Sequence, residues 1–362
     1  MPTWLDMTTV FRSAPLHRRT VLGAALTALG ATLPFAATAA GTAAPEPAAG
    51  LDPVRLSRAM DRAGRLDQIH ALVIGRHGRV VVAKAFRGPP PHRGVNVKSV
   101  SKTIVATLVG AAIDRGVLPG VDWPLASAAP GLIPPDADPR VHGINMAHLL
   151  TMQAGLEPTS GPEYGRWIES RNWVSHALSR PFAAEPGERM IYSTGSYHVL
   201  GAVLARRTGR SLLALAREWL GEPLGIEVPA WTRDPQGFYL GGNNMVLSPL
   251  DLFRFGEMWQ GGGVWKGRRV VGAGWVEASW TARTRSPFSG DAYGYGWFLA
   301  EANGRPVLYA RGYGGQMLYL VPSLGLTVVV TSDAGRPARS HGYVGVLNAL
   351  LAEDIIPAAE AA

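Results

Sequence analysis

Strand-forming segments lie toward both ends of the chain, and this arrangement constrains its fold more than any other feature. Between Ile69 and Phe86, two apolar, β-branched runs flank Arg76-His77-Gly78-Arg79, which predicts a β-hairpin. Far downstream, four more strand-like runs follow one another at Tyr293–Leu299, Pro306–Ala310, Gln316–Val321 and Leu326–Thr331. We therefore expect strands from the two ends to form one sheet.

The middle of the chain is rich in helical patterns joined by loops that contain Pro and Gly. A helix is predicted to begin near Ser99 and to end at Gly116. Helical spacing recurs at 197–207 and 211–220, and an amphipathic helix is predicted over 343–356. Together these segments predict an α+β fold, in which an antiparallel β-sheet is flanked by N- and C-terminal helices and a mostly helical domain is inserted. We assign residues of about 51–90 and 288–357 to the sheet lobe and about 91–287 to the helical lobe.

The N-terminus has the parts of a cleavable export signal. Arg18-Arg19 precedes an uncharged, weakly apolar stretch, and Ala37-Thr38-Ala39 supplies small residues for cleavage. The paired arginines after a long leading segment resemble the twin-arginine type of signal. We expect a signal over 1–39, a linker over 40–50 and a folded hydrolase domain over 51–357. This predicts an exported protein, periplasmic or secreted, with no stable membrane span after cleavage.

Composition excludes several classes of chemistry. The chain has no cysteine, which excludes disulfides, thiolate metal sites and cysteine nucleophiles. Its formal net charge is +8, but the arginines are scattered without basic runs, so we expect no nucleic-acid partner. The nine histidines show no metal-ligand spacing, and we expect no metal or other cofactor. The sequence does not determine the oligomeric state.

Ser99 and Lys102 form an S-x-x-K pattern at the start of the first predicted helix. Lys102 is one of only four lysines, with Lys84, Lys98 and Lys266, in a chain that otherwise uses arginine. Arginine stays protonated in proteins, whereas a buried lysine can lose its proton and act as a base. Residues i and i+3 share a helix face, so the Ser99 hydroxyl and the Lys102 amine can lie within hydrogen-bond reach. Because S-x-x-K also occurs by chance, the interpretation depends on other motifs.

Two further motifs supply what an activated serine needs. Tyr192-Ser193-Thr194 follows a Pro-Gly turn, and Arg311-Gly312-Tyr313-Gly314-Gly315 lies between two predicted strands. A serine nucleophile requires a base, a proton donor for the leaving group and backbone N–H groups for the oxyanion. The chain has neither G-x-S-x-G nor a nucleotide-binding glycine motif, which argues against the corresponding folds.

The order S-x-x-K, then Y-S-T, then a glycine-rich late strand resembles the serine β-lactamase and penicillin-binding-protein family. The tyrosine in the second motif resembles the branch of class C β-lactamases, D,D-peptidases and esterases. Further stretches resemble family members that act as esterases and 6-aminohexanoate-dimer hydrolases; they are Asp234-Pro235-Gln236-Gly237, Gly242-Asn243-Asn244-Met245, Ser248-Pro249-Leu250-Asp251 and Tyr293-Gly294-Tyr295-Gly296-Trp297.

This resemblance implies a role for each motif. Ser99 would attack a carbonyl and become acylated. Lys102 would hold or accept the Ser99 proton, and we expect it to stay cationic while Tyr192 moves the proton to the leaving group and then activates water. The backbone N–H groups of Ser99 and Tyr313 would form the oxyanion hole. Candidate substrate-binding residues are Gly312, Gly314, Asn243 and Asn244.

One position departs from the family pattern. The third motif is usually K-T-G or H-T-G, and aligning its glycine with Gly312 places Ala310 where the cation is expected. Arg311 is next in sequence, but alternation along a strand predicts that it points to the opposite face. We therefore favour an esterase or amidase acting on small or neutral acyl substrates. The alternatives are a β-lactamase or D,D-carboxypeptidase with the same machinery and a non-catalytic penicillin-binding-like module.

Overall fold

The computed structural model describes residues 50–361. The predicted export signal and residues 40–49 of the linker lie outside the described residues. An eight-stranded sheet with the order β2-β1-β12-β11-β10-β9-β8-β7 dominates the fold, and every neighbouring pair is antiparallel. Its strands are β1 (Ile69–Arg76), β2 (Arg79–Ala85), β7 (Thr284–Arg285), β8 (Ala292–Tyr293), β9 (Phe298–Ala302), β10 (Arg305–Gly312), β11 (Gln316–Val321) and β12 (Leu326–Ser332).

The predicted pairing between the two ends of the chain is confirmed. The hairpin of β1 and β2 joins the late strands because β1 pairs with β12 along its whole length, from Ile69 opposite Ser332 to Arg76 opposite Leu326. Strands β11 and β12 are buried throughout, which accounts for their continuous apolar sequence; β2 lies at the sheet edge and is largely exposed.

One strand prediction is wrong. The run Tyr293–Leu299 is interrupted, since β8 ends at Tyr293 and β9 begins only at Phe298. Between them, the Gly294 N–H donates a 2.9 Å hydrogen bond to the Trp297 carbonyl, which closes a turn. Gly296 has a φ of 81° in this turn, a conformation that a side chain would disfavour. The apolar pattern therefore belongs to two strands and a tight turn.

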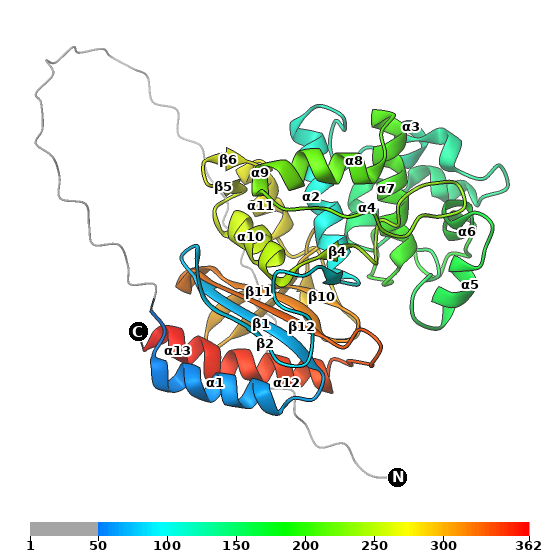
Figure 1. Cartoon of the computed structure of the whole chain (residues 1–362). Coiled ribbons are helices and arrows are strands. Elements are labelled where there is room, and N and C mark those ends of the chain that lie inside the picture. Colours follow the sequence, from blue (N-terminus) through cyan, green and yellow to red (C-terminus); the bar gives the residue numbers. More distant parts are fainter. Residues whose placement is uncertain (1–49, 362) are drawn as a thin grey trace, which may run out of the picture.

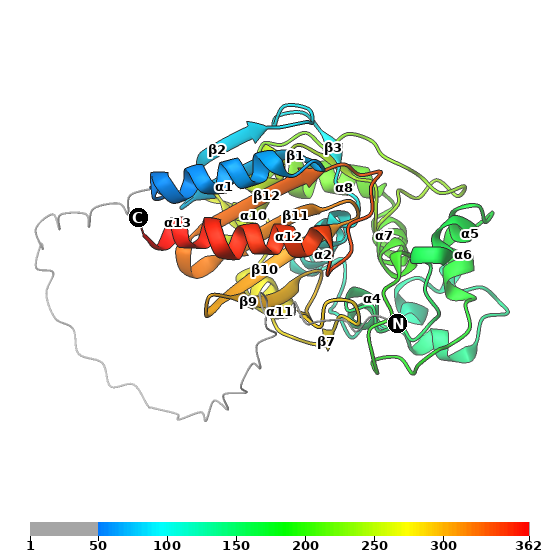
Figure 2. The ribbon, with the colours of Figure 1, turned by 90° about the horizontal axis from the view of Figure 1, so that it is seen from below.

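Terminal helices cover one face of the sheet. They are α1 (Pro53–Arg65), α12 (Tyr343–Leu350), η6 (Leu351–Ile355) and α13 (Ile356–Glu360). Figures 1 and 2 show α1 lying beside α12 and α13 across the strands. Asp52 caps α1 by accepting the Arg55 N–H at 2.8 Å, and Pro53 begins the helix because it has no N–H to satisfy. The predicted C-terminal helix is thus confirmed, with a wider turn in its middle.

Helices α2 (Val100–Asp114) and α10 (Pro249–Gln260) contact the sheet from the opposite side (Figure 1). The first thirteen residues of α2, Val100–Ala112, are all buried, which explains a helix that is apolar on every side. Helix α7 (Thr194–Thr208) packs against α2 and confirms the helix predicted at 197–207. The segment predicted at 211–220 is α8 (Leu212–Ala216), continued by the wider turn η4 (Arg217–Gly221).

The remaining elements are short. They are α3 (Leu125–Ala128), α4 (Met146–Leu150), α5 (Tyr164–Ile168), α6 (Trp173–Leu178), α9 (Glu222–Leu224), α11 (Ala273–Ser279), η1 (Pro130–Leu132), η2 (Pro139–Gly143), η3 (Gly161–Glu163), η5 (Pro322–Leu324) and the strand pairs β3 (Val95–Asn96) with β4 (Val246–Leu247) and β5 (Val264–Trp265) with β6 (Arg268–Arg269).

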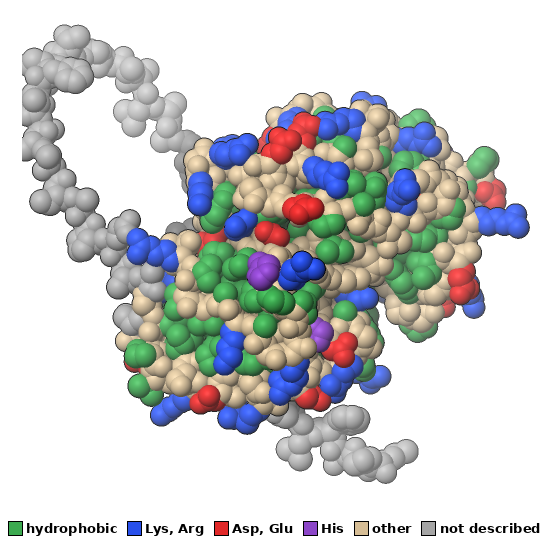
Figure 3. Space-filling model, viewed as in Figure 1, with side chains coloured by type: hydrophobic (Ala, Val, Ile, Leu, Met, Phe, Trp, Pro, Cys, Tyr) green, Lys and Arg blue, Asp and Glu red, His purple; other side chains and the backbone are tan. Residues whose placement is uncertain are grey.

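The surface carries charge in dispersed form. On the face shown in Figure 3, Lys and Arg side chains are separated from one another and interleaved with acidic ones. Among residues 50–361, no helix is long and apolar enough to cross a membrane.

Candidate active site

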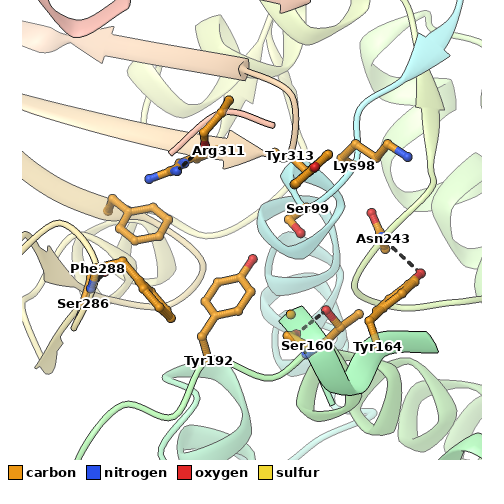
Figure 4. Close-up of a pocket in the computed structure, with 15 residues that line it drawn as sticks. Lys98, Ser99, Ser160, Tyr164, Tyr192, Asn243, Ser286, Phe288, Arg311 and Tyr313 are labelled. Carbon is orange, nitrogen blue, oxygen red and sulfur yellow. Dashed lines mark hydrogen bonds between the residues drawn. The ribbon is translucent and has the colours of Figure 1, made fainter. Parts of the chain in front are cut away.

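A pocket of about 420 Å³ lies where the start of α2, the end of β10 and the segment before α7 meet (Figure 4). Its lining combines hydroxyl groups, aromatic rings and two cations, and contains no carboxylate. The lining residues are Lys98, Ser99, Ser160, Gly161, Tyr164, Tyr192, Thr194, Asn243, Ser286, Phe288, Phe298, Arg311, Gly312, Tyr313 and Ala338.

Ser99 lies immediately before α2 and presents its hydroxyl to this pocket. A serine at a helix start commonly caps the helix with its side chain, but Ser99 makes no such bond. The preceding residue, Lys98, has a φ of 51°, which is uncommon for a residue with a side chain. Its N–H donates to Asn96 Oδ1 at 2.9 Å, and its carbonyl accepts from Ser101 Oγ at 2.6 Å. These bonds hold the turn that leaves Ser99 exposed to the pocket.

Lys102 lies beneath Ser99 and is buried, with 2 % of its surface exposed. Its Nζ donates to three oxygen atoms: Ser99 Oγ at 3.0 Å, Thr194 Oγ1 at 3.2 Å and the Gly242 carbonyl at 2.7 Å. Burial lowers the pKa of Lys102 below the ordinary 10.5, and the neighbouring Tyr192 hydroxyl opposes this shift in part. The predicted i, i+3 contact between Ser99 and Lys102 is therefore present.

Tyr192 reaches the same place from the segment before α7. Lys102 Nζ lies 4.9 Å from the centroid of its ring, and Figure 4 shows its hydroxyl pointing toward Ser99. On the outer side, its ring makes an edge-to-face contact with Phe288 at a centroid distance of 6.4 Å. The structure thus brings together Ser99, Lys102 and Tyr192, which are separated by up to 93 positions in sequence.

The end of β10 comes unusually close to the turn before Ser99. A Cβ atom added at Gly312 would lie 2.5 Å from the Val97 carbonyl oxygen, so only glycine permits this approach. As a result, Tyr313 lies at the pocket beside Ser99 (Figure 4). Within residues 50–361, neither the Ser99 nor the Tyr313 backbone N–H donates a hydrogen bond to another protein group. Both donors are available for an oxyanion.

The structure separates the other predicted binding residues. Gly312 and Asn243 line the pocket, and Asn243 Nδ2 donates to the Tyr164 hydroxyl at 3.0 Å. Asn244 is outside the lining, has a φ of 64° and accepts from Asn96 Nδ2 at 3.0 Å, which gives it a turn role. Gly314 is also outside the lining and packs against Asp333.

The orientation of Arg311 differs from the one predicted from the sequence. Ala310 is 1 % exposed and does not line the pocket, whereas Arg311 does. The Arg311 guanidinium donates to Ser340 Oγ at 2.7 Å and to the Ala338 carbonyl at 2.9 Å, both in the loop before α12. Alternation along a regular strand predicts that Arg311 points away from the site. The prediction fails because β10 ends one residue later, at Gly312, and the loop before α12 folds back over the end of the strand. Lys98 is a second cation that sequence reasoning did not assign to the site.

Sequence reasoning also missed Ser160, Tyr164, Ser286, Phe288 and Phe298. Phe298 begins β9, within a run predicted as a strand, and the other four come from loops and a short helix without a periodic pattern; only tertiary placement brings all five to the pocket. Among the described residues, no cluster of His, Asp or Glu has the arrangement of a metal site.

Comparisons with known proteins identify the family of this chain. Residues 68–353 match the Beta-lactamase family model. The 6-aminohexanoate-dimer hydrolase of Paenarthrobacter ureafaciens is 28 % identical over 349 residues, covering 87 % of this chain and 86 % of its own length. Esterase EstB of Burkholderia gladioli is 29 % identical over 214 residues, covering 49 % of this chain and 54 % of its own.

A solved structure shows the same fold. EstCE1, a hydrolase with promiscuous acyltransferase activity, superposes with a TM-score of 0.67 at 20 % identity, covering 83 % of this chain and 99 % of its own. The family match spans most of the chain and includes each of the three motifs. The protein belongs to the Beta-lactamase family.

Proposed function

We propose that this protein is a serine hydrolase that cleaves an ester or amide bond of a small substrate through a Ser99 acyl-enzyme. The observation that carries the proposal is the position of Lys102, a buried amine whose Nζ lies 3.0 Å from Ser99 Oγ. A serine hydroxyl is a weak nucleophile unless an adjacent base takes its proton. The similarity to an amide-bond hydrolase and an esterase supports the same reaction class.

Acylation begins with the neutral amine of Lys102. As Ser99 Oγ bonds to the carbonyl carbon, its proton passes to Nζ, and the carbonyl oxygen takes up the electron pair. Burial lowers the pKa of Lys102 and so makes the amine that can accept this proton easier to form than for an exposed lysine. The developing oxyanion would face the N–H groups of Ser99 and Tyr313. One such donor is typically worth about 3 kcal/mol in the transition state.

Collapse of the tetrahedral intermediate expels an alcohol or amine, which needs a proton. The hydroxyl of Tyr192 points toward Ser99 and its ring faces Lys102, which supports Tyr192 as the group that would donate this proton. In the second half of the reaction, a water molecule loses a proton to the same group as it attacks the acyl carbon. Ser99 then recovers its proton and the acid product leaves.

Arg311 supports a second candidate substrate class, in which the acyl donor carries a carboxylate. Its guanidinium lines the pocket and its two hydrogen bonds go to neutral oxygen atoms. A permanently charged arginine recognises carboxylates well. β-Lactams and peptidoglycan stems belong to this class, so turnover of nitrocefin and release of D-alanine test it against neutral esters.

Covalent labelling tests the serine mechanism directly. A fluorophosphonate should add its phosphonyl group to Ser99, located by mass spectrometry of the digested protein, and p-nitrophenyl esters should be hydrolysed. Ser99→Ala should abolish both signals, whereas Ser286→Ala, which removes another pocket hydroxyl, should keep both. Full labelling or activity of Ser99→Ala would exclude this assignment, and absence of any adduct in the unmodified protein would favour the non-catalytic module.

We also propose that the protein is exported, on the basis of Arg18-Arg19 and the segment that follows them. Replacing both arginines by lysine should retain the protein inside the cell while unchanged chain appears in the exported fraction. Equal export of the two forms would contradict the twin-arginine route.

A further inference from the structure

Two short segments beside Lys102 are joined by paired hydroxyl groups. Ser160 Oγ lies 2.8 Å from Thr194 Oγ1 and accepts the Thr194 N–H at 2.8 Å. One residue earlier, Thr159 Oγ1 lies 3.0 Å from Ser193 Oγ and accepts the Gly195 N–H at 2.8 Å. Each pair joins two hydroxyl groups and accepts one backbone N–H from the start of α7, but the surroundings differ: Ser160 lines the pocket, whereas Thr159 is 1 % exposed and lies outside the lining.

Hydrogen-bond chemistry fixes the direction of donation in the Ser160 pair. The Lys102 ammonium has three hydrogens and no acceptor, and its Nζ has three oxygen partners, so Thr194 Oγ1 accepts one of them. The Thr194 hydroxyl is then free to donate, and Ser160 Oγ is its neighbour. Ser160 Oγ accepts this hydrogen as well as the Thr194 N–H. Its own hydrogen must point elsewhere, and Ser160 opens onto the pocket.

We propose that Lys102, Thr194 and Ser160 form a proton wire, and that Ser160 is a further catalytic residue that protonates the leaving group. The inference rests on the proposed acyl-enzyme function. It is an alternative to donation by Tyr192, because the leaving group receives its proton from Lys102 through Thr194 and Ser160 instead of from the Tyr192 hydroxyl. Each hydroxyl in the wire gains one proton and loses another, so neither becomes charged once transfer is complete.

The steps balance. Lys102 gains the Ser99 proton when the bond from Ser99 Oγ to the acyl carbon forms. It then gives one proton to Thr194 Oγ1, whose own proton moves to Ser160 Oγ, whose proton moves to the departing oxygen or nitrogen as its bond to the acyl carbon breaks. Lys102 returns to the neutral amine, the form that its desolvated position favours.

The leaving group provides a test that a merely structural role would not pass. p-Nitrophenolate departs without a proton, whereas an alkoxide or an amine departs only with one. We therefore compare kcat/KM for a p-nitrophenyl ester and for an alkyl ester with the same acyl group. Ser160→Ala should lower the value for the alkyl ester by about 100-fold, the lower end of general acid catalysis, and should barely change it for the p-nitrophenyl ester.

Thr159→Val is the matched control. It removes a hydroxyl from the same pair of segments and leaves the Gly195 N–H without its partner, as Ser160→Ala does for the Thr194 N–H. Because Thr159 touches neither Lys102 nor the pocket, any effect should be equal for the two esters. Thr194→Val should reproduce the selective loss and Thr194→Ser, which keeps the hydroxyl, should restore the rate.

Equal losses on both esters in Ser160→Ala, or no loss on the alkyl ester, would overturn the wire. A solvent isotope effect gives a measurement on the unmodified protein: its proton inventory for the alkyl ester should curve because several protons move together. A linear inventory would contradict the proposal. These outcomes remain distinct from failure of the acyl-enzyme itself, which would appear as continued labelling of Ser99→Ala.

Discussion

Lys102 and Arg311 both lie at the candidate active site, and their surroundings differ in an instructive way. Lys102 is buried beneath Ser99, and all of its hydrogen-bonding capacity is directed at Ser99, Thr194 and Gly242. Arg311 is half-buried in the pocket lining, where its guanidinium binds the loop before α12 (Figure 4). An amine can lose its proton when it is desolvated, whereas a guanidinium cannot. In the function that we propose, Lys102 therefore takes part in proton transfer, and Arg311 orients the substrate and selects its charge.

The largest expected effect comes from giving position 102 the same type of side chain as position 311. Lys102→Arg keeps the positive charge but removes the possibility of a neutral base. We expect kcat/KM to fall by about 10²–10⁴-fold, the contribution of a general base, with the fold retained. Lys84→Arg, at an exposed position on β2, is the control and should be silent. Full activity of Lys102→Arg would mean that charge alone suffices.

The close approach of the end of β10 to the turn before Ser99 depends on Gly312. In Gly312→Ala, the new Cβ would lie 2.5 Å from the Val97 carbonyl oxygen and would push the end of β10 away from Ser99. Because the Tyr313 N–H moves with it, kcat should fall by about 10²–10³-fold, as for the loss of one oxyanion donor. Gly274→Ala in α11, where the added Cβ meets open space, should change little. An unchanged kcat in Gly312→Ala would exclude Tyr313 from the oxyanion hole.

The pH dependence of kcat/KM reports on the protonation of Lys102. Burial lowers the pKa of Lys102 from 10.5, and the active form is the amine. Activity should therefore be lost as pH falls through this lowered pKa, by about tenfold per pH unit once the ammonium dominates. The midpoint of the rise of kcat/KM with pH should lie below 10.5, and the rise should persist in Lys98→Arg. A rise centred at 10.5 would mean that Lys102 is not desolvated in solution.

Arg311 should show a smaller and more selective effect. Arg311→Gln should raise KM by about tenfold for an ester that carries a carboxylate, since a charge-assisted hydrogen bond is lost, and should spare the neutral ester. Arg339→Gln makes the same change in net charge in the adjoining loop, outside the pocket lining. Equal losses on both esters would indicate instead that Arg311 acts only by holding the loop.

Much of the fold was predictable because burial leaves a strong pattern. The hairpin at 69–86 forms β1 and β2, and the continuous apolar runs at 316–321 and 326–331 form the buried strands β11 and β12. The interrupted run at 293–299 was misjudged because Gly296 turns the chain between two short strands while its neighbours remain apolar. Periodicity does not register a turn whose flanking side chains are buried.

The sequence by itself determined the antiparallel sheet, the helix that begins after Ser99 and the three motifs, because each depends on local spacing or on apolar runs. Only the tertiary structure decided that Arg311 lines the pocket in place of Ala310, that Asn243 and not Asn244 faces it, and that Ser160 extends the hydrogen bonds of Lys102 into it. These choices depend on where a strand ends and how distant loops fold back. Such contacts are set by packing between segments far apart in the chain, which no local pattern records.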